Sequence, residues 1–463
     1  MALLDHTWWR LLAQYLLRYC VISLVLPQPA CAAGRPTSLQ PYGGSTATMQ
    51  PIERLPVAPG GTLLTGQITI EQALDQTLLS GPRAAAARSM LGIANAGLIQ
   101  AKILPNPALE FDNGYAELSY RFGVAIPVEP PWKMVFRIAA AKAQIGVATV
   151  QMEQALWFLR ADVRRAYAEL VVAQESQKMM RELAQLTDSL AEVARKRFKA
   201  GEVPKLDMFK AELAAVQAEV DSEQEDRRVQ QAREQLNIVM GRPETAELSV
   251  PSLAPFQLHA EKANSLLPDL SVELPPLSQY VNGALKDRLE LKLIEKEILA
   301  NKANRKVTIG NIIPNGQLST GWDKQINHGS DPTLNRMYLM GSFPLPILDR
   351  QQGELARLRA NERNLNYDLL SQQNIIRGQV DMAYRRVVNA REIMRRYQDR
   401  IIAQSQKVAE LGRLSYQLGQ TDITSALNAQ QANIQVRNAY LTQVMNYEQG
   451  FTDLEQAVGH ILQ

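Results

Sequence analysis

The residues able to bind metals or perform catalysis are few and far apart in this sequence. The four histidines (His6, His259, His328 and His460) occur singly, and the only two cysteines, Cys20 and Cys31, lie near the N-terminus. A zinc-type centre needs several such ligands close together, so a His/Cys metal site in the body of the chain is close to excluded. The sequence also lacks a glycine-rich phosphate loop, a His-Glu-x-x-His motif and a nucleophile elbow. It therefore predicts a protein that is not an enzyme and needs no cofactor.

The charge and composition indicate long helices and exclude a basic surface for nucleic acid. The 463 residues contain 50 Lys plus Arg and 47 Asp plus Glu, a net charge of only +3. Binding to phosphates needs a clear excess of basic residues, so we expect no nucleic-acid partner. Hydrophobic residues make up 46% but aromatic residues only 6%, and the mean hydropathy is −0.20. These values are not those of a polytopic helical membrane protein.

The N-terminus has the pattern of an export signal. An apolar stretch from Leu11 to Leu26 is followed by prolines and by the small-residue run Ala30-Cys31-Ala32-Ala33. This pattern predicts a cleavable signal peptide over residues 1–32, with a retained anchor as the alternative. Lipidation of Cys31 after cleavage is a second alternative. Residues 33–66, rich in Gly, Ser, Thr and Pro, predict an extended N-terminal arm.

Two long stretches without proline predict very long helices. They run from Trp132 to Val203 and from Asp349 to Gln463. A helix from about Arg350 to Ser415 would be roughly 100 Å long. From this stretch alone, a soluble structural coiled coil is the favoured interpretation. Within the helix, spacings of four and three alternate over five heptads of a coiled-coil seam: Ile376, Val380, Ala383, Val387, Ala390, Met394, Tyr397, Ile401, Gln404, Val408 and Leu411.

The chain repeats the same order of elements twice. The segment RADVRRAYAELVVA (160–173) matches RGQVDMAYRRVVNA (377–390) at an offset of 217 residues. Further on, FKAG and YQLG, which end at Gly201 and Gly419, match at an offset of 218. Such self-similarity indicates an internal duplication. It predicts a first repeat over residues 67–242, a linker over 243–278 and a second repeat over 279–463.

Each repeat also contains a predicted β-hairpin, over about residues 106–127 and 313–346. From Leu118 to Ile126, apolar residues alternate with polar or small ones, as in a strand with apolar surroundings on one face. Four strands cannot close a barrel in lipid, so strands that enter the membrane require several copies of the chain. Twelve strands from a trimer would leave an aqueous lumen, whereas eight from a dimer would be filled by side chains. A small soluble sheet is the alternative.

Together these features resemble the outer membrane efflux protein family, the TolC-like exit ducts, from Gln67 to Gln463. The matching segments are ITIEQAL (68–74), PNPALEF (105–111), IPVEPPWKMVFRIAAAKA (126–143) and the two glycine hairpins. The resemblance implies a mainly α fold with a small β part. In that fold a trimer joins a long coiled-coil α-helical barrel to one transmembrane β-barrel, with four strands per subunit. The second and third segments look most like the heavy-metal branch, although Pro130-Pro131-Trp132-Lys133 stands where that branch usually has Gly-Gly-Lys-Arg.

The resemblance also implies roles for the residues at the two hairpins. The tips are expected to contact an adaptor through Arg197, Gly201, Val203, Gly419 and Gln420. The periplasmic aperture is expected at Tyr416, Asp422, Ser425 and Asn428, with Asp422 supplying a ring of charge in place of the aspartates of drug exporters. The residues alone also allow simpler roles. A glycine after a helix is commonly a C-cap, and Asp422 suits the N-cap of the next helix.

The implied function is that of a passive exit duct in the outer membrane, with a helical tunnel in the periplasm. The expected partners are two further copies of the chain, a membrane-fusion adaptor, outer-membrane lipid, and an inner-membrane pump of the resistance-nodulation-division or ABC type. Heavy-metal cations are the expected cargo. The alternatives are a duct for type I protein secretion and a periplasmic coiled-coil protein without a channel.

Overall fold

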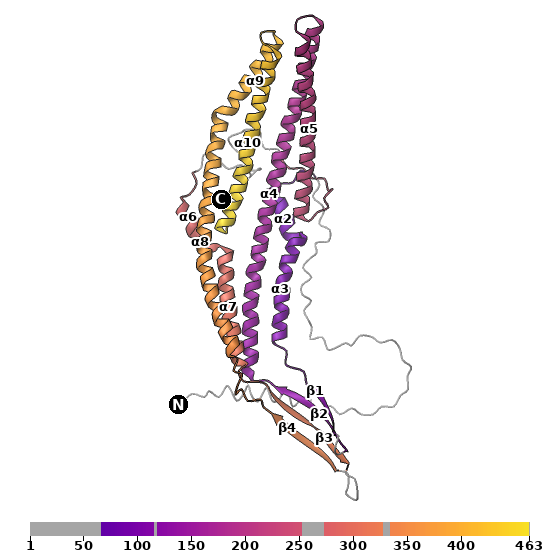
Figure 1. Ribbon diagram of the computed structural model, residues 1–463, viewed down its shortest axis with the longest axis vertical. Helices are drawn as coiled ribbons and strands as arrows, with labels where there is room; N and C mark the ends of the chain where they lie inside the picture. Colours follow the sequence, from indigo (N-terminus) through magenta and orange to yellow (C-terminus); the bar gives the residue numbers. More distant parts are fainter. Residues whose placement is uncertain (1–65, 115–117, 252–272, 327–333, 463) are drawn as a thin grey trace, which may run out of the picture. The chain divides into compact units, whose positions relative to one another are not determined.

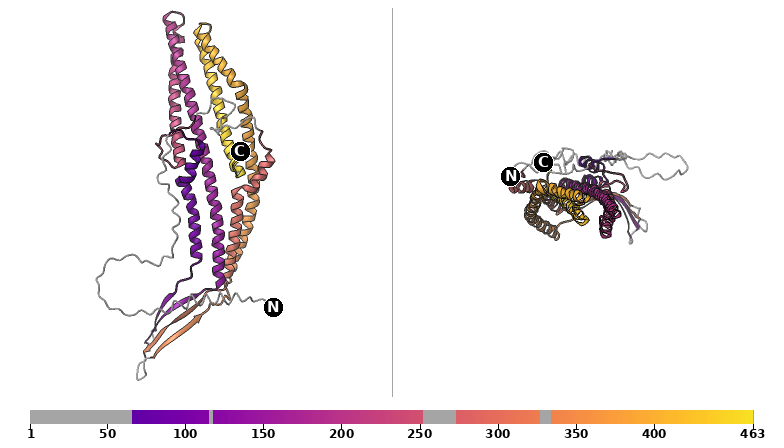
Figure 2. Two further views of the ribbon diagram at one scale, coloured as in Figure 1. Left: turned by 180° about the vertical axis from the view of Figure 1, so that it is seen from behind. Right: turned by 90° about the horizontal axis from the view of Figure 1, so that it is seen from above.

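The computed structural model describes residues 66–114, 118–251, 273–326 and 334–462, which belong to one compact unit. The predicted signal peptide, Cys31 and nearly all of the predicted arm lie outside the described residues, as do three of the four histidines. Within this unit the long helices run side by side, with a sheet at one end and two helical hairpin tips at the other (Figures 1 and 2). The prediction of a mainly α fold with a small β part is confirmed.

The first half of the unit contains two shorter helices, a β-hairpin and a long helical hairpin. Helix α2 begins with a capping box, in which the Thr69 hydroxyl accepts from the backbone N–H of Gln72 at 3.3 Å and the Gln72 side chain accepts from that of Thr69 at 3.0 Å. The elements are α2 (Ile70–Ser80), α3 (Pro82–Ala101), β1 (Ala108–Gly114), β2 (Leu118–Val128), α4 (Pro131–Lys199) and α5 (Lys205–Met240).

The second half has the same order of elements. They are α6 (Leu277–Asp287), α7 (Leu289–Gly310), β3 (Gly316–Ile326), β4 (Leu334–Ser342), α8 (Gln352–Arg396), a π-helical turn (Tyr397–Ile401), α9 (Ile402–Gln417) and α10 (Ile423–Val458). No helix in the described part of the chain is both long and apolar enough to cross a lipid bilayer.

The second helix of each helical hairpin ends in the same way. Helices α5 and α10 both contain 36 residues and stop at glycines with positive φ, Gly241 at 73° and Gly459 at 85°. Glycine adopts this conformation without steric cost, which ends a helix cleanly. The two halves therefore agree in the order of their elements and in the length of these helices.

A core of buried side chains joins the two halves. Val163 and Leu170 of α4, Val380 and Val387 of α8, and Leu454 of α10 are all inaccessible to solvent. Burying a side chain of this size stabilises a fold by roughly 1.5–3 kcal/mol, so this cluster holds α4 against the helices of the second half.

The predicted coiled-coil seam is correct for its first half and wrong for the rest. Its residues from Ile376 to Met394 are buried. Beyond the π-helical turn, however, Val408 and Leu411 are 51% and 63% exposed, and the buried residues are instead Ile402 and Ala409. The buried face has moved by one residue, which is the effect of one extra residue in the helix.

The four strands form one antiparallel sheet in the order β1-β2-β3-β4. Both predicted hairpins are confirmed, with β2 ending one residue later than expected, at Val128. Directly paired residues share a face of a sheet. The register aligns Phe111, Phe122, Trp322 and Met337 in one row across all four strands.

Candidate functional site

Both hairpin tips are closed by the same glycine turn. The backbone N–H of Gly201 donates to the carbonyl of Phe198 at 2.9 Å, and that of Glu202 donates to the carbonyl of Arg197 at 2.9 Å. Gly419 and Gln420 make the equivalent pair of bonds, to Tyr416 and Ser415. This is the Schellman motif, and both glycines have φ of 75°. The C-cap interpretation of the two glycines is therefore confirmed.

Arg197 connects the two helical hairpins next to their tips. Its Nη1 donates to the carbonyl oxygen of Tyr416 at 3.0 Å, and its guanidinium carbon lies 5.3 Å from the centre of the Tyr416 ring. Its Nε donates to Glu202 at 3.1 Å, next to the tip of its own hairpin. Tyr416 is buried with Leu190 and Ile423, and this burial raises the pKa of its hydroxyl. Arg197, Tyr416 and Gly419, predicted separately, are thus brought together.

Asp422 is the N-cap of α10. Its carboxylate accepts from the backbone N–H of Ser425 at 3.3 Å and from the Ser425 hydroxyl. These hydrogen bonds stabilise the charged form, so the pKa of Asp422 is below its ordinary value. Asp422, Ser425 and Asn428 are all exposed and follow one another at intervals of three residues, on one face of α10. Val203 is half-buried and Gln420 exposed.

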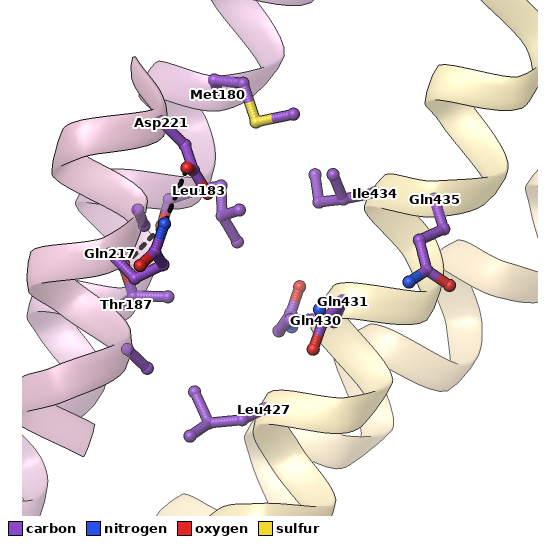
Figure 3. A pocket seen from close by; sticks show the side chains of 12 residues that line it. Met180, Leu183, Thr187, Gln217, Asp221, Leu427, Gln430, Gln431, Ile434 and Gln435 are labelled. Atoms are coloured by element: carbon purple, nitrogen blue, oxygen red, sulfur yellow. Dashed lines mark hydrogen bonds between the residues drawn. The ribbon is translucent and has the colours of Figure 1, made fainter. Parts of the chain in front are cut away.

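A groove separates the two helical hairpins between their tips and the middle of the molecule. Side chains from α4 and α5 on one side and from α10 on the other point toward one another across it (Figure 3). The volume is about 270 Å³, and the lining includes Leu183, Ile434 and the amides Gln430 and Gln431. The one carboxylate in the lining, Asp221, accepts from Gln217 at 2.9 Å. The groove is therefore uncharged over most of its surface.

A buried network of charges, which the sequence reasoning missed, joins α4 to α10. Arg160 lies 2.6 Å from Glu455, and Arg164 lies 3.4 Å from Glu448. Both glutamates are at most 3% exposed. Burial raises the pKa of Glu448 to about 8, although Arg164 opposes the shift. The only signal in the sequence is two glutamates seven residues apart on a helix with few other charges.

The two faces of the sheet differ in chemistry. Phe111, Phe122, Trp322 and Met337 form an exposed apolar row, each between 55% and 71% exposed. On the other face Asp323 lies 3.9 Å from Arg121 and 3.8 Å from Arg336. An apolar face opposite a charged face suits a sheet that separates lipid from water.

The four residues that replace the usual Gly-Gly-Lys-Arg have a structural role. Pro130 and Pro131 begin α4, and the Lys133 ammonium donates to the Asn315 side chain at 2.6 Å. The Lys133 hydrogen bond ties the start of α4 to the connection between α7 and β3. The described residues contain no group of three or more His, Cys, Asp or Glu side chains placed to hold a metal ion.

Comparison with known proteins agrees with this architecture. Residues 83–242 match the outer membrane efflux protein family. The cobalt-zinc-cadmium resistance protein CzcC of Cupriavidus metallidurans is 25% identical over 408 residues, which cover 85% of this chain and 90% of that protein.

The fold is also that of solved channels. CusC, whose crystal structures concern folding and transmembrane channel formation, has a TM-score of 0.65 at 15% identity. The alignment covers 86% of this chain and 93% of the CusC chain. The open state of the Neisseria gonorrhoeae MtrE outer membrane channel has a TM-score of 0.63 at 16% identity and covers 85% and 89%. The family match over residues 83–242, the curated relative over 85% of the chain and the fold shared with solved channels all agree with the outer membrane efflux channel that the motifs predicted.

Proposed function

We propose that three copies of the chain assemble into one outer-membrane exit duct. The observation that carries this proposal is the sheet. Its strands β1 and β4 are edges, and one of its faces exposes an apolar row from Phe111 to Met337. Open edges are not tolerated in lipid, so the sheet must be completed by further copies. Twelve strands then close a barrel around water, and the long helical hairpins continue it as a tunnel through the periplasm.

The two halves of the chain are repeats that arose by duplication. Support comes from the equal lengths of α5 and α10 and from their starts, which lie 218 residues apart. A trimer of such chains has six similar helical hairpins around one axis. The repeats span residues 67–242 and 279–463, with residues 243–278 as the linker between them.

The hairpin tips form the periplasmic entrance. Asp422, Ser425 and Asn428 line the aperture, where three copies of Asp422 form a ring that attracts cations, and Tyr416, which is buried, supports the aperture from behind. Support comes from the shared exposed face of the last three residues. The adaptor contacts the turns at Gly201 and Gly419 with their neighbours Arg197, Val203 and Gln420.

The cargo consists of divalent heavy-metal cations, delivered by an adaptor and an inner-membrane pump of the resistance-nodulation-division type. Support comes from the relative named for resistance to cobalt, zinc and cadmium. The channel needs no metal ligands of its own, because a duct that binds its cargo tightly would block itself.

The experiment has two parts. Purified protein should run as a heat-stable trimer and conduct ions in planar bilayers, whereas a lipid-free monomer without conductance would refute the duct. Cells that lack the gene should become sensitive to cobalt, zinc or cadmium, and the wild-type gene should restore growth. Unchanged metal sensitivity together with retention of a secreted protein would instead assign the duct to type I secretion.

A further inference from the structure

The long helix that leads to the second tip is interrupted by a single π-helical turn. Tyr397–Ile401 adopts this conformation between α8 and α9, and the helix changes direction there (Figure 1). The turn packs on α10, where the Gln398 side chain donates to the Tyr440 hydroxyl at 2.8 Å. A π-helical turn contains one residue more than an α-helical turn, and such turns are frequent at functional sites.

Equivalent buried positions of the two halves show where the extra residue entered. Before the turn, Val163 and Leu170 correspond to Val380 and Val387 at an offset of 217, and all four are buried. After the turn the offset is 218, and the correspondence continues: Ala191 and Ala409 are both buried, as are Val229 and Tyr447 on the helices that follow the tips. The second half therefore contains one inserted residue, and the π-helical turn absorbs it.

Beyond the π-helical turn, small residues lie on the inner face of α9. Ala409 is buried, and its carbonyl accepts from the Gln430 side chain of α10 at 2.9 Å. A Cβ atom added to Gly412 would lie 3.0 Å from the Cβ of Ala429, so no large side chain fits there. The large apolar residues of the predicted seam point outward instead, and they form what we call the α9 stripe: Ile401, Val408, Leu411 and Leu418, which are 39% to 71% exposed.

An uninterrupted α-helix would present a different outer face. Each residue of α9 would occupy the place that its successor now has, because one residue turns the helix by about 100°. Arg400, Lys407 and Glu410 would then point outward in place of the α9 stripe. The π-helical turn thus keeps the apolar residues on the outer face, where an uninterrupted α-helix of the same sequence would place charged ones.

The first half of the chain shows what such a stripe packs against. Leu190 of α4, the equivalent of Val408, is fully buried against the second helical hairpin, next to Leu427 of α10. The equivalent of Leu427 in the first hairpin is Phe209 of α5, which is 50% exposed. Phe209 belongs to an exposed row with heptad spacing, which we call the α5 stripe: Leu206, Phe209, Leu213, Val216 and Val220. In an assembly, the α5 stripe of a second copy can cover the α9 stripe.

Charges beside the two stripes are complementary. Glu219 flanks the α5 stripe on the same side as Glu212, which also pairs with Arg195 of its own chain at 2.9 Å, and Arg400 and Lys407 flank the α9 stripe. Helix α5 leaves its tip and α9 approaches its own, so the two helices meet antiparallel when the tips of two copies point the same way (Figure 1). In an antiparallel pair of heptad stripes, flanking positions of the same kind face one another, which places the acidic side against the basic side.

We propose that the π-helical turn is a register device, which turns the α9 stripe outward so that α9 of one copy packs against α5 of the next copy. The proposal rests on the oligomeric duct described above and adds the surface through which its copies meet. The π-helical turn also explains why the two tips end in the same glycine turn, although the helix that leads to the second tip contains one residue more.

Disulfide cross-linking tests the pairing in the full chain with Cys20 and Cys31 replaced by Ser. Leu411→Cys is combined with Leu206→Cys, Leu213→Cys or Val220→Cys, which are one heptad apart, because heptad stripes can pair in registers that differ by seven residues. We expect one of the three pairs to give covalent dimers and trimers on oxidation. If none does while the protein remains a conducting trimer, the interface is wrong but the duct stands. Loss of trimer and conductance in the parent protein would instead refute the duct.

A one-residue deletion tests the π-helical turn itself. Deleting Asp399 should restore a regular α-helix and leave α9 facing as it does now, so the cross-link yield should stay within about twofold of the parent. The matched control is deletion of Gln185 in α4, where no π-helical turn can absorb it. There the tip should rotate by about 100° and the yield should fall by at least about tenfold. If deleting Asp399 is as damaging as deleting Gln185, the register device is refuted.

Discussion

Replacing Glu448 by Gln should remove much of the pH dependence of stability. The Glu448 carboxyl is buried between α4 and α10, near Arg164 and Glu455, with Tyr447 and Arg391 close by. Burial raises its pKa from the ordinary 4.5 to about 8. The folded protein therefore holds a proton that the unfolded chain has already released over this range. Stability must fall as the pH rises through this window, because the unfolded state binds fewer protons.

The size of the effect follows from the width of the window. Each pH unit between the two pKa values changes the free energy of unfolding by about 1.4 kcal/mol. From about pH 5.5 to 7.5 this group should cost the wild type roughly 2.7 kcal/mol. Gln resembles the protonated acid in shape and cannot ionise, so Glu448→Gln should lose that part of the slope.

Denaturation by guanidinium in detergent, at about pH 5.5, 6.5 and 7.5, measures the slope directly. Glu455→Gln is the matched control, since Glu455 lies seven residues away on the same helix and accepts from Arg160 at 2.6 Å. It should lower stability at every pH and keep most of the slope, because burial, and only to a lesser extent the charge of Glu455, raises the pKa of Glu448. The reasoning fails if wild type and Glu448→Gln lose stability equally between pH 5.5 and 7.5.

Three further predictions concern the tips and the sheet. Asp422→Ala should destabilise the start of α10 by about 1 kcal/mol and weaken cation preference in planar bilayers, whereas Asp422→Asn keeps the cap and tests the charge alone. Gly419→Ala should cost about 1–2 kcal/mol, seen as faster hydrogen exchange at the tip, because its φ is 75°; Gly378→Ala, in open space on α8, should not be destabilising. Trp322→Arg should disfavour membrane insertion by about 2–4 kcal/mol in an extraction assay, and Arg336→Lys on the other face should insert normally.

Local patterns in the sequence were enough to predict the elements and their order. Proline-free stretches marked α4 and the helix that leads to the second tip, and period-two alternation marked β2. Glycines 201 and 419 marked the tips because positive φ at a helix end is a local requirement. The resemblance to the outer membrane efflux protein family was visible for the same reason, since the motifs that carry it are short and continuous.

Tertiary packing decided what depends on contacts between distant helices. The heptad pattern around Val408 and Leu411 is as regular as that around Val380. In the structure, however, the small residues Ala409 and Gly412 face inward, because α10 lies too close for larger side chains. A single π-helical turn rotates the rest of the helix by about one residue, so a different face becomes buried. The periodicity of the sequence does not say which neighbouring helix each face will contact. The environment of Glu448 likewise arises only when α4 reaches α10, since desolvation is a property of the assembled core and not of the residue.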